Sequence, residues 1–226
     1  MAGSDSARGE GIERPGAQQW IPETLTKSSL SAGVQACRGC ELYRDATHGV
    51  PGQGRLDASV MVVGEQPGDQ EDRQGKPFVG PAGKLLVRAL EDADIDARLV
   101  FRTNAVKHFR WDPGRAGKRI HKGPSRVHVA ACTPWLLAEL DLVRPEGVLL
   151  LGATAGAAVF GSSFRVGASR GRALDWPADG VRSSWTPSWA VATAHPSAVL
   201  RSRQREQDYA ALVADLEVVA GLVSAR

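Results

Sequence analysis

Cysteine is scarce in this chain, with three residues among 226. So few thiols, and an odd number of them, argue against the disulfide framework that holds small secreted domains together. The sequence also lacks an apolar run long enough to span a bilayer, and an N-terminal pattern of basic and then apolar residues typical of a secretion signal. We therefore expect a cytoplasmic protein without membrane contact, in which the cysteines bind metal or have a structural role.

Neither sign of charge dominates the composition. Lys and Arg number 28 against 25 Asp and Glu, which gives a formal net charge of +3. This mildly basic balance permits a polyanionic partner without requiring one. Residues 1–20 contain almost nothing apolar, so we expect a disordered N-terminal tail. Residues 21–226 show no internal repeat and are interpreted as a single domain.

Strand and helix patterns alternate along the body of the chain. Apolar runs predict strands at residues 59–65, 99–105, 147–151 and 189–193. Helical patterns occupy residues 82–93, 125–143, 153–160 and 205–222, with a shorter one at 30–43. This order predicts a three-layer α/β/α fold with a central four-stranded, mostly parallel sheet. Residues 164–187 are interpreted as hairpins or loops, and residues 161–188 contain no recognisable motif.

A long loop follows the first predicted strand. Residues 64–80 are rich in glycine, proline and carboxylates, and they include an amide and an aromatic ring. Open α/β sheets place ligand sites in loops at the carboxyl ends of strands. These side chains can orient, stack on and polarise a flat polar ligand. For Asp69 and Asp72 a turn-forming role is the alternative, and it is the favoured one for Asp72.

The cysteines suggest a metal site without defining it. Cys37-x-x-Cys40 suits a redox pair or half of a zinc site equally well. Cys132 is a third candidate ligand, and His108 is a fourth because imidazole can replace thiolate at an iron–sulfur centre. The alternative is that the cysteines fill the core and that His108 is a surface residue.

Residues 110–125 are strongly basic. Lys and Arg side chains at this density bind phosphates, although a solvated charged loop is the commoner outcome. His121 lies within this segment and can serve as a nucleophile if a site lies beside it. A lone loop histidine more often has no catalytic role.

Taken together, these pieces resemble the iron–sulfur uracil-DNA glycosylases of family 4, and most closely their UdgX branch. The resemblance covers nearly the whole chain from Cys37 to the last predicted helix. The motifs that carry it are, in order, Cys37-x-x-Cys40, Gly64-Glu65-Gln66-Pro67-Gly68, Pro77-Phe78-Val79-Gly80, Thr103-Asn104, Lys118-Arg119-Ile120-His121, Cys132, Leu151-Gly152-Ala153-Thr154-Ala155 and His195-Pro196-Ser197. Ordinary family 4 enzymes have Cys at the position of His108 and lack the insertion that carries His121. Both differences match the UdgX branch.

The resemblance implies a cofactor and a uracil pocket. A [4Fe-4S] cluster would be held by Cys37, Cys40, His108 and Cys132. Phe78 would stack on a flipped uracil, and the Asn104 amide would bind its polar edge. His195 would donate a hydrogen bond toward uracil O2, and the loop with Ser197 and Arg201 would approach the DNA backbone. Gly64, Asp69 and Arg119 complete the substrate-binding positions that we expect.

The resemblance also implies an unusual end to the reaction. In the UdgX branch the loop histidine, matched here by His121, bonds to the deoxyribose C1′ that remains after excision. Glu65 is our candidate for orienting that ring, and Gln66 for holding water or the sugar–base linkage. The usual inserted loop begins Lys-Arg-Arg where this chain has Gly117-Lys118-Arg119. Lys118 lacks the planar fork of arginine, and Gly117 loses a charge and adds flexibility.

The leading hypothesis is therefore a glycosylase that excises uracil and stays attached to the DNA through His121. An ordinary turnover glycosylase that uses water is the alternative within the class. A non-catalytic binder of uracil-containing or single-stranded DNA is the alternative outside it. A redox carrier is less favoured because no second cofactor motif is present. We expect a monomer whose partners are uracil and uracil-containing DNA, with single-stranded DNA preferred.

Overall fold

Parallel strands form the centre of the structure, a computed structural model that describes residues 14–177 and 183–224. The sheet order is β2-β1-β5-β7-β6. Its parallel members are β1 (Val60–Gly64), β2 (Val100–Asn104), β5 (Gly147–Leu151) and β7 (Trp189–Thr193). The short β6 (Ala173–Leu174) adds an antiparallel edge. The predicted strands and the mostly parallel sheet are confirmed, and β1, β5 and β7 are buried along their whole length, as strands covered on both faces require.

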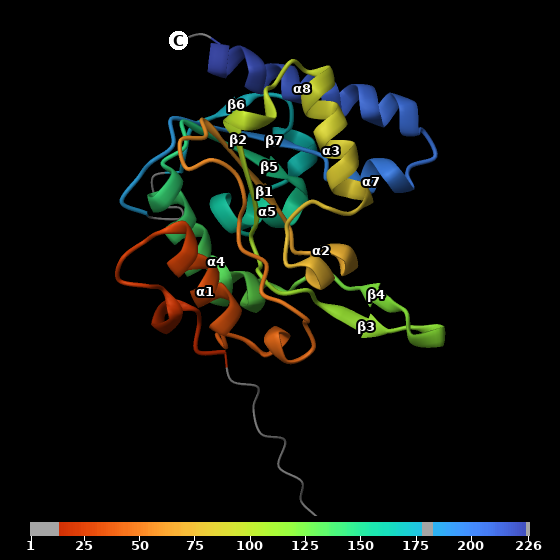
Figure 1. Cartoon of the computed structure of the whole chain (residues 1–226). Helices are drawn as coiled ribbons and strands as arrows, with labels where there is room; N and C mark the ends of the chain where they lie inside the picture. Colours follow the sequence, from red (N-terminus) through yellow and green to blue (C-terminus); the bar gives the residue numbers. More distant parts are fainter. Residues whose placement is uncertain (1–13, 178–182, 225–226) are drawn as a thin grey trace, which may run out of the picture.

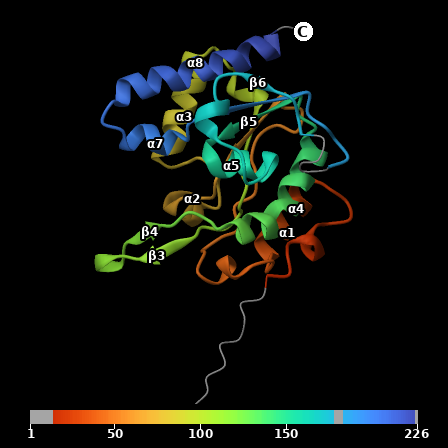
Figure 2. The same cartoon turned by 180° about the vertical axis from the view of Figure 1, so that it is seen from behind.

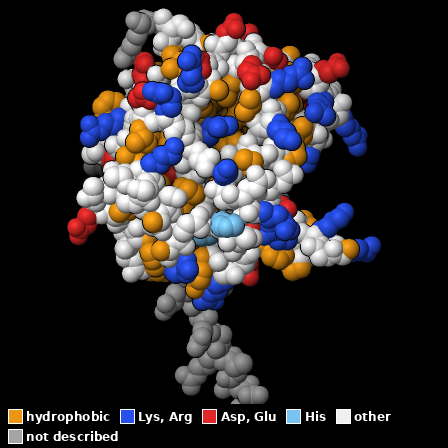
Figure 3. Space-filling model, in the orientation of Figure 1, with side chains coloured by type: hydrophobic (Ala, Val, Ile, Leu, Met, Phe, Trp, Pro, Cys, Tyr) orange, Lys and Arg blue, Asp and Glu red, His pale blue; other side chains and the backbone are white. Residues whose placement is uncertain are grey.

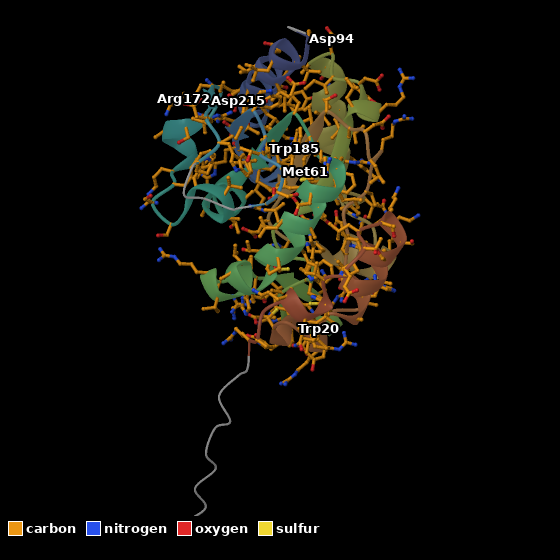
Figure 4. The ribbon with its side chains drawn as sticks, turned by 90° about the vertical axis from the view of Figure 1, so that its left-hand side faces the viewer. Trp20, Met61, Asp94, Arg172, Trp185 and Asp215 are labelled. Atoms are coloured by element: carbon orange, nitrogen blue, oxygen red, sulfur yellow. The ribbon has the colours of Figure 1, made fainter. Side chains whose placement is uncertain are left out.

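Alternate strand residues face two separate helical layers (Figures 1 and 2). On one face, Val60 and Val62 pack with α3 (Pro81–Asp92) and α8 (Arg205–Ser224). On the other face, Met61 and Val63 pack with α4 (Arg126–Val143) and α5 (Gly152–Phe160). Figure 4 shows Met61 at the centre of the molecule. The three-layer α/β/α architecture and the four long predicted helices are thus confirmed.

Three short helices were not expected from the sequence. They are α2 (Asp69–Gln74), α6 (Val166–Ser169) and α7 (Pro196–Arg201). Two of them, α2 and α7, begin just beyond the carboxyl ends of β1 and β7, so they lie at the edge of the sheet where ligands bind.

The N-terminal part packs against α4. Helix α1 (Lys27–Ala36) ends before Cys37, so the predicted helical segment at 30–43 is interrupted between the two cysteines and resumes as a 3₁₀ turn at Glu41–Arg44. Residues 1–13 of the predicted tail lie outside the described residues. The prediction of disorder is wrong for residues 14–20, because Ala17 is 1% exposed and its N–H donates to Ala131 O at 2.9 Å. Trp20, labelled in Figure 4, lies beside α1.

A β-hairpin projects from the body where the sequence suggested a basic loop. Strands β3 (Trp111–Pro113) and β4 (Arg119–His121) pair antiparallel, with Trp111 opposite His121. The turn at the tip uses positive φ at Ala116 (54°) and Gly117 (72°). Glycine adopts such a φ without strain, so Gly117 suits this turn. Figure 1 shows the hairpin as a projecting arm, and Figure 3 shows Lys and Arg side chains on it.

The segment without a motif closes the far edge of the sheet. It contributes α6 and β6, and Trp185 donates from its indole N–H to Pro145 O at 2.7 Å. Residues 178–182 of this segment lie outside the described residues. None of the helices in the described part of the chain is long and apolar enough to cross a membrane.

Candidate active site

A cavity of about 620 Å³ opens at the carboxyl ends of the parallel strands. It gathers side chains from five separate stretches of the chain. The predicted site residues that line it are Glu65, Gln66, Phe78, Asn104, His121, His195 and Ser197. Ligand sites in open parallel sheets occur at this edge, so the fold and the cavity agree on where a ligand binds.

Phe78 and Asn104 line the cavity, and Gly64, which does not line it, lies against both of them. A Cβ at Gly64 would lie 2.3 Å from Asn104 Oδ1 and 2.8 Å from the Phe78 ring, so a side chain there would displace both. Phe78 has a left-handed backbone (φ 58°), a conformation that costs energy and is found at ligand sites. The Asn104 side chain makes no hydrogen bond with the described residues. Its amide therefore has both a donor and an acceptor available for a ligand.

His195 presents a defined tautomer to the cavity. The N–H of Ser197 donates to His195 Nδ1 at 3.1 Å, which places the proton of the neutral ring on Nε2. Burial, with smaller contributions from His121 and Arg201, lowers the pKa of His195 to about 4. The ring is therefore neutral at neutral pH, and its Nε2–H remains free to donate toward a ligand.

His121 lies on the cavity side of the hairpin base, and half of its side chain is exposed. The Nε2 atom lies 3.0 Å from the Gln66 amide nitrogen and 3.6 Å from Glu65 Oε1. An amide nitrogen only donates, so this contact requires an unprotonated Nε2. With Gln66 donating, Nε2 carries a lone pair that can act as a nucleophile once this contact is released.

Gln66 lines the cavity and also bonds to the hairpin segment. Its Oε1 accepts from Arg110 N–H at 3.2 Å, and its amide nitrogen lies 3.1 Å from both Arg110 O and Lys122 O. The side chain therefore ties together the two ends of the hairpin segment at the edge of the cavity. Its two hydrogens are shared among three acceptors, so the contact with His121 Nε2 is easily released.

Asp69 and Arg119 were predicted to bind substrate, yet neither lines the cavity. Arg119 Nε and Nη1 lie 2.6 Å from Asp69 Oδ1 and Asp72 Oδ2 respectively, and its guanidinium also packs on Phe109 and Trp111. Asp72 is fully buried and accepts from the Thr47 and His48 N–H groups, so it does cap backbone amides, but it does so from inside helix α2 and not from the local turn that was expected. Although burial acts to raise it, hydrogen bonds from Arg73 and Arg119 hold the pKa of Asp69 below its usual value. These contacts fasten the hairpin to α2 and to the loop at 45–48.

Two residues of the site had no role assigned from the sequence. The Thr154 hydroxyl donates to Glu65 and fixes that carboxylate at the cavity rim. Glu71 accepts from Gly68 N–H at 3.0 Å and Gly80 N–H at 2.9 Å, which closes the loop that carries Phe78. The spacing of Gly68 and Glu71 matches the glutamate half of a capping box, a local signal that indicates this role.

The three cysteines among the candidate metal ligands lie together where α4 packs against the N-terminal segment. Cys37, Cys40 and Cys132 are buried in one cluster with Trp135 and Ala138. Gly39 N–H donates to Cys37 Sγ at 3.4 Å, and Lys107 N–H donates to Cys132 Sγ at 3.2 Å. Burial raises the pKa of Cys132 to about 12, so this thiol stays protonated unless a cation holds the thiolate.

Two buried histidines lie near the cysteines, and they differ in their hydrogen bonding. His128 accepts from Ser125 N–H at Nδ1 (3.0 Å), and its Nε2 lies 2.9 Å from Glu41 Oε1, so both nitrogens are engaged. His108 is 5% exposed, and its ring makes no hydrogen bond with the described residues. Burial lowers the pKa of His108 to about 4, which leaves the neutral form that binds metals. Of the two, His108 is the available ligand.

These features define a class: a parallel α/β protein with a polar, aromatic-walled cavity at the carboxyl ends of its strands. Within this class, the chain belongs to the uracil DNA glycosylase superfamily, whose family model matches residues 51–217. It is 34% identical over 178 residues to the Type-4 uracil-DNA glycosylase of Thermotoga maritima. This alignment covers 78% of this chain and 84% of the Thermotoga protein. It is 33% identical over 172 residues to the Type-4 uracil-DNA glycosylase of Pyrobaculum aerophilum, with 74% and 81% of the two chains covered.

Proposed function

We propose that this protein excises uracil from DNA and then forms a covalent bond between His121 and the deoxyribose C1′ of the abasic site. The observation that carries the proposal is the position of His121, whose unprotonated Nε2 lies in the same cavity as Phe78, Asn104 and His195. An ordinary binding module has no need for a nucleophile beside its ligand pocket. Family membership and the Type-4 relatives support the excision step.

Uracil binding would use the wall of the cavity. The Phe78 ring offers a face on which a flipped base can stack, and the Asn104 amide can donate to a uracil carbonyl while accepting from N3–H. Gly64 leaves the room that the base needs, because any Cβ there would collide with Asn104 and Phe78. A 5-methyl group would add bulk to a pocket of this kind, which favours uracil over thymine.

Base departure would be assisted by His195. As the C1′–N1 bond breaks, its electron pair moves onto uracil and negative charge develops at O2. The Nε2–H of His195 is held in the donating tautomer by Ser197 and can stabilise that charge. A positioned donor of this kind is worth about 3 kcal/mol in the transition state.

Capture would follow from the same cavity. The Nε2 lone pair of His121 bonds to the oxocarbenium-like C1′, and the ring proton on Nδ1 is then lost to solvent, which leaves a neutral imidazole adduct. Glu65 Oε1, 3.6 Å from Nε2, places a negative charge beside the developing cation. Thr154 keeps this carboxylate in position.

We also propose a [4Fe-4S] cluster bound by Cys37, Cys40, Cys132 and His108. No group of three or more His, Cys, Asp or Glu side chains in the described residues is gathered tightly enough for a single metal ion. A cluster of four irons is broader than one ion, and its ligands therefore stand further apart. The donors fit: three buried thiols, two with N–H···S bonds, and a neutral imidazole without another partner. Such a cluster would tie the N-terminal segment, α4 and the turn after β2 together.

Covalent capture is tested by denaturing gel electrophoresis. The cluster-loaded protein is incubated with a fluorescent single-stranded oligonucleotide that contains one uracil, boiled in denaturant and separated by electrophoresis. We expect a slow band that survives boiling, and none with a thymine oligonucleotide. His121→Ala should lose the band, whereas Lys118→Ala, at the hairpin tip and outside the cavity, should keep it.

The other outcomes separate the alternatives. Abasic product without a slow band would contradict capture and leave an ordinary turnover glycosylase. Absence of any uracil release would leave a DNA-binding protein. A slow band that persists in His121→Ala would show that another residue is the nucleophile.

A further inference from the structure

A second hollow adjoins the candidate active site. It has a volume of about 470 Å³ and lies between the first turns of α4, helix α5 and the segment that follows α5. It shares Ala153 and Thr154 with the uracil cavity, so the two hollows are neighbours on either side of the start of α5. Whatever chain enters the cavity can therefore extend into this groove without leaving the surface.

The groove carries positive charge that the described residues do not neutralise. Arg126 and Arg165 line it, and none of its described lining residues is Asp or Glu. Arg126 makes no hydrogen bond or ion pair with the residues that the structure describes. Among the described residues, Arg165 donates only to the backbone carbonyls of Ser162 and Phe164, at 3.1 and 2.9 Å, so none of them compensates its charge. Two exposed, unpaired arginines at one groove favour an anionic occupant.

The wall of the groove suits a base rather than a bare anion. Phe164 lines it and is stacked on Phe160, with ring centroids 5.4 Å apart, so its position is fixed. On the α5 side the groove is lined by the small apolar side chains of Ala157 and Ala158. Aromatic and apolar surface beside arginine is the combination that binds successive nucleotides of a single strand. The volume also falls within the range of small-ligand sites.

We propose that this groove binds the nucleotide next to the target uridine on the same DNA strand. Its base lies against Phe164 and the alanines of α5, and its phosphate is held by Arg126 and Arg165. The inference rests on the proposed function and extends it from a uracil pocket to a two-nucleotide site. A neighbouring base can enter the groove only when it is unstacked, so the groove also favours single-stranded over double-stranded substrate.

The test compares oligonucleotides that differ by one neighbour. The probe carries 2′-fluoro-2′-deoxyuridine, which resists excision, with a nucleotide on the 5′ side only, on the 3′ side only, or on both sides. Binding to the holoprotein is followed by fluorescence anisotropy over a range of salt concentrations. We expect removal of one of the two neighbours to weaken binding by roughly tenfold, since it removes a charge-assisted contact and a stacked base.

The variants assign that loss to the groove. In Arg126→Gln/Arg165→Gln, binding of the two-sided probe should fall to the level of the trimmed probe. The slope of log affinity against log salt should also fall by about 0.7 for the lost phosphate contact. Ala157→Tyr, which fills the groove without changing charge, should abolish the benefit of the neighbour and keep most of the salt slope. Arg98→Gln removes a single positive charge just before β2, at the opposite end of the sheet, and should bind like the wild type.

Two results would overturn the inference. Equal binding of all three probes by the wild type would mean that no neighbour is recognised. A neighbour effect that persists in both groove variants would place the contact elsewhere. Either result leaves uracil release from the natural substrate intact, so it differs from failure of the proposed function, in which the wild type releases no uracil from any strand.

Discussion

Lys107 Nζ and Glu139 Oε2 lie 2.7 Å apart, and both side chains are completely buried. Lys107 also donates to Thr103 Oγ1 and to the backbone oxygen of Asn104, each at 2.7 Å. Glu139 accepts in addition from Gly52 N–H at 2.8 Å. The backbone N–H of the same lysine donates to Cys132 Sγ. One ion pair therefore fixes the chain at the end of β2. This stretch connects Asn104, which lines the cavity, to the cysteines of the proposed cluster.

Breaking this pair from one side should destabilise the fold strongly. Lys107→Met leaves a buried carboxylate without its counter-charge, and we expect the free energy of unfolding to fall by about 3–5 kcal/mol. The double variant Lys107→Met/Glu139→Leu removes both charges and should be more stable than the single variant. Urea denaturation of the three proteins measures both differences. Lys84→Met on the exposed face of α3 should change stability by less than about 0.5 kcal/mol. A double variant less stable than the single one would contradict the argument.

Arg119 should control capture without binding substrate. Its guanidinium bonds Asp69 and Asp72 at the same time, and lysine cannot span both carboxylates. In Arg119→Lys the hairpin loses one fastening and His121 shifts relative to the cavity. We expect the rate of covalent adduct formation to fall by about 10- to 100-fold, as small misplacements of a reacting group do. Uracil release should fall less, because Arg119 does not line the cavity.

Arg73→Lys is the matched control for this prediction. Arg73 binds the other oxygen of Asp69 across one turn of α2, at the surface, and does not touch the hairpin. Its adduct rate should match that of the wild type. Equal loss of uracil release and adduct formation in Arg119→Lys would instead indicate a direct role in substrate binding.

The sheet was predictable because its strands are short apolar runs buried on both faces, such as residues 147–151. The helices that cover it have apolar residues at helical spacing. The elements that were missed carry neither signal. Helix α2 (Asp69–Gln74) is polar throughout, and the hairpin strands have three residues each, one of them Pro113. Long-range hydrogen bonds and ion pairs of Arg119 and Gln66 hold these elements in place. A local sequence pattern cannot predict such contacts.

The site was partly predictable for the same reason. Residues that follow strands reach the cavity through topology, which explains Glu65, Asn104 and His195. Asp69 and Arg119 were expected at the substrate because charge in a loop suggests ligand binding, yet they bind each other across 50 positions. Nothing in the sequence indicated that Lys107 is buried, since a lysine after a strand is usually a surface residue. Its partner Glu139 is found only once α4 packs on the sheet.

His195 should make stability depend on pH. Its folded-state pKa of about 4 lies below the usual value of 6.5, so the unfolded chain binds a proton that the folded chain excludes between these values. The contribution is present in full above pH 6.5 and is lost as the pH falls toward 4. In His195→Asn, which can still cap α7, the fall in unfolding free energy between pH 7 and pH 5 should be smaller. Identical pH dependence in the two proteins, measured by urea denaturation, would contradict a buried neutral ring.

His108 should decide whether the proposed cluster assembles. The purified protein is expected to be brown, with broad visible absorption and about equal iron and sulfide content, because three thiolates and one imidazole suit such a centre. His108→Ala removes the only buried imidazole near the cysteines whose ring has no other described partner, and the colour should bleach and the iron content fall. His108→Cys supplies a thiolate at the same place and should retain the iron. His48→Ala, whose ring is engaged with Asp72 O at 2.7 Å, should stay brown. A colourless wild type that contains zinc would overturn the cluster, and a brown His108→Ala protein would remove His108 from it.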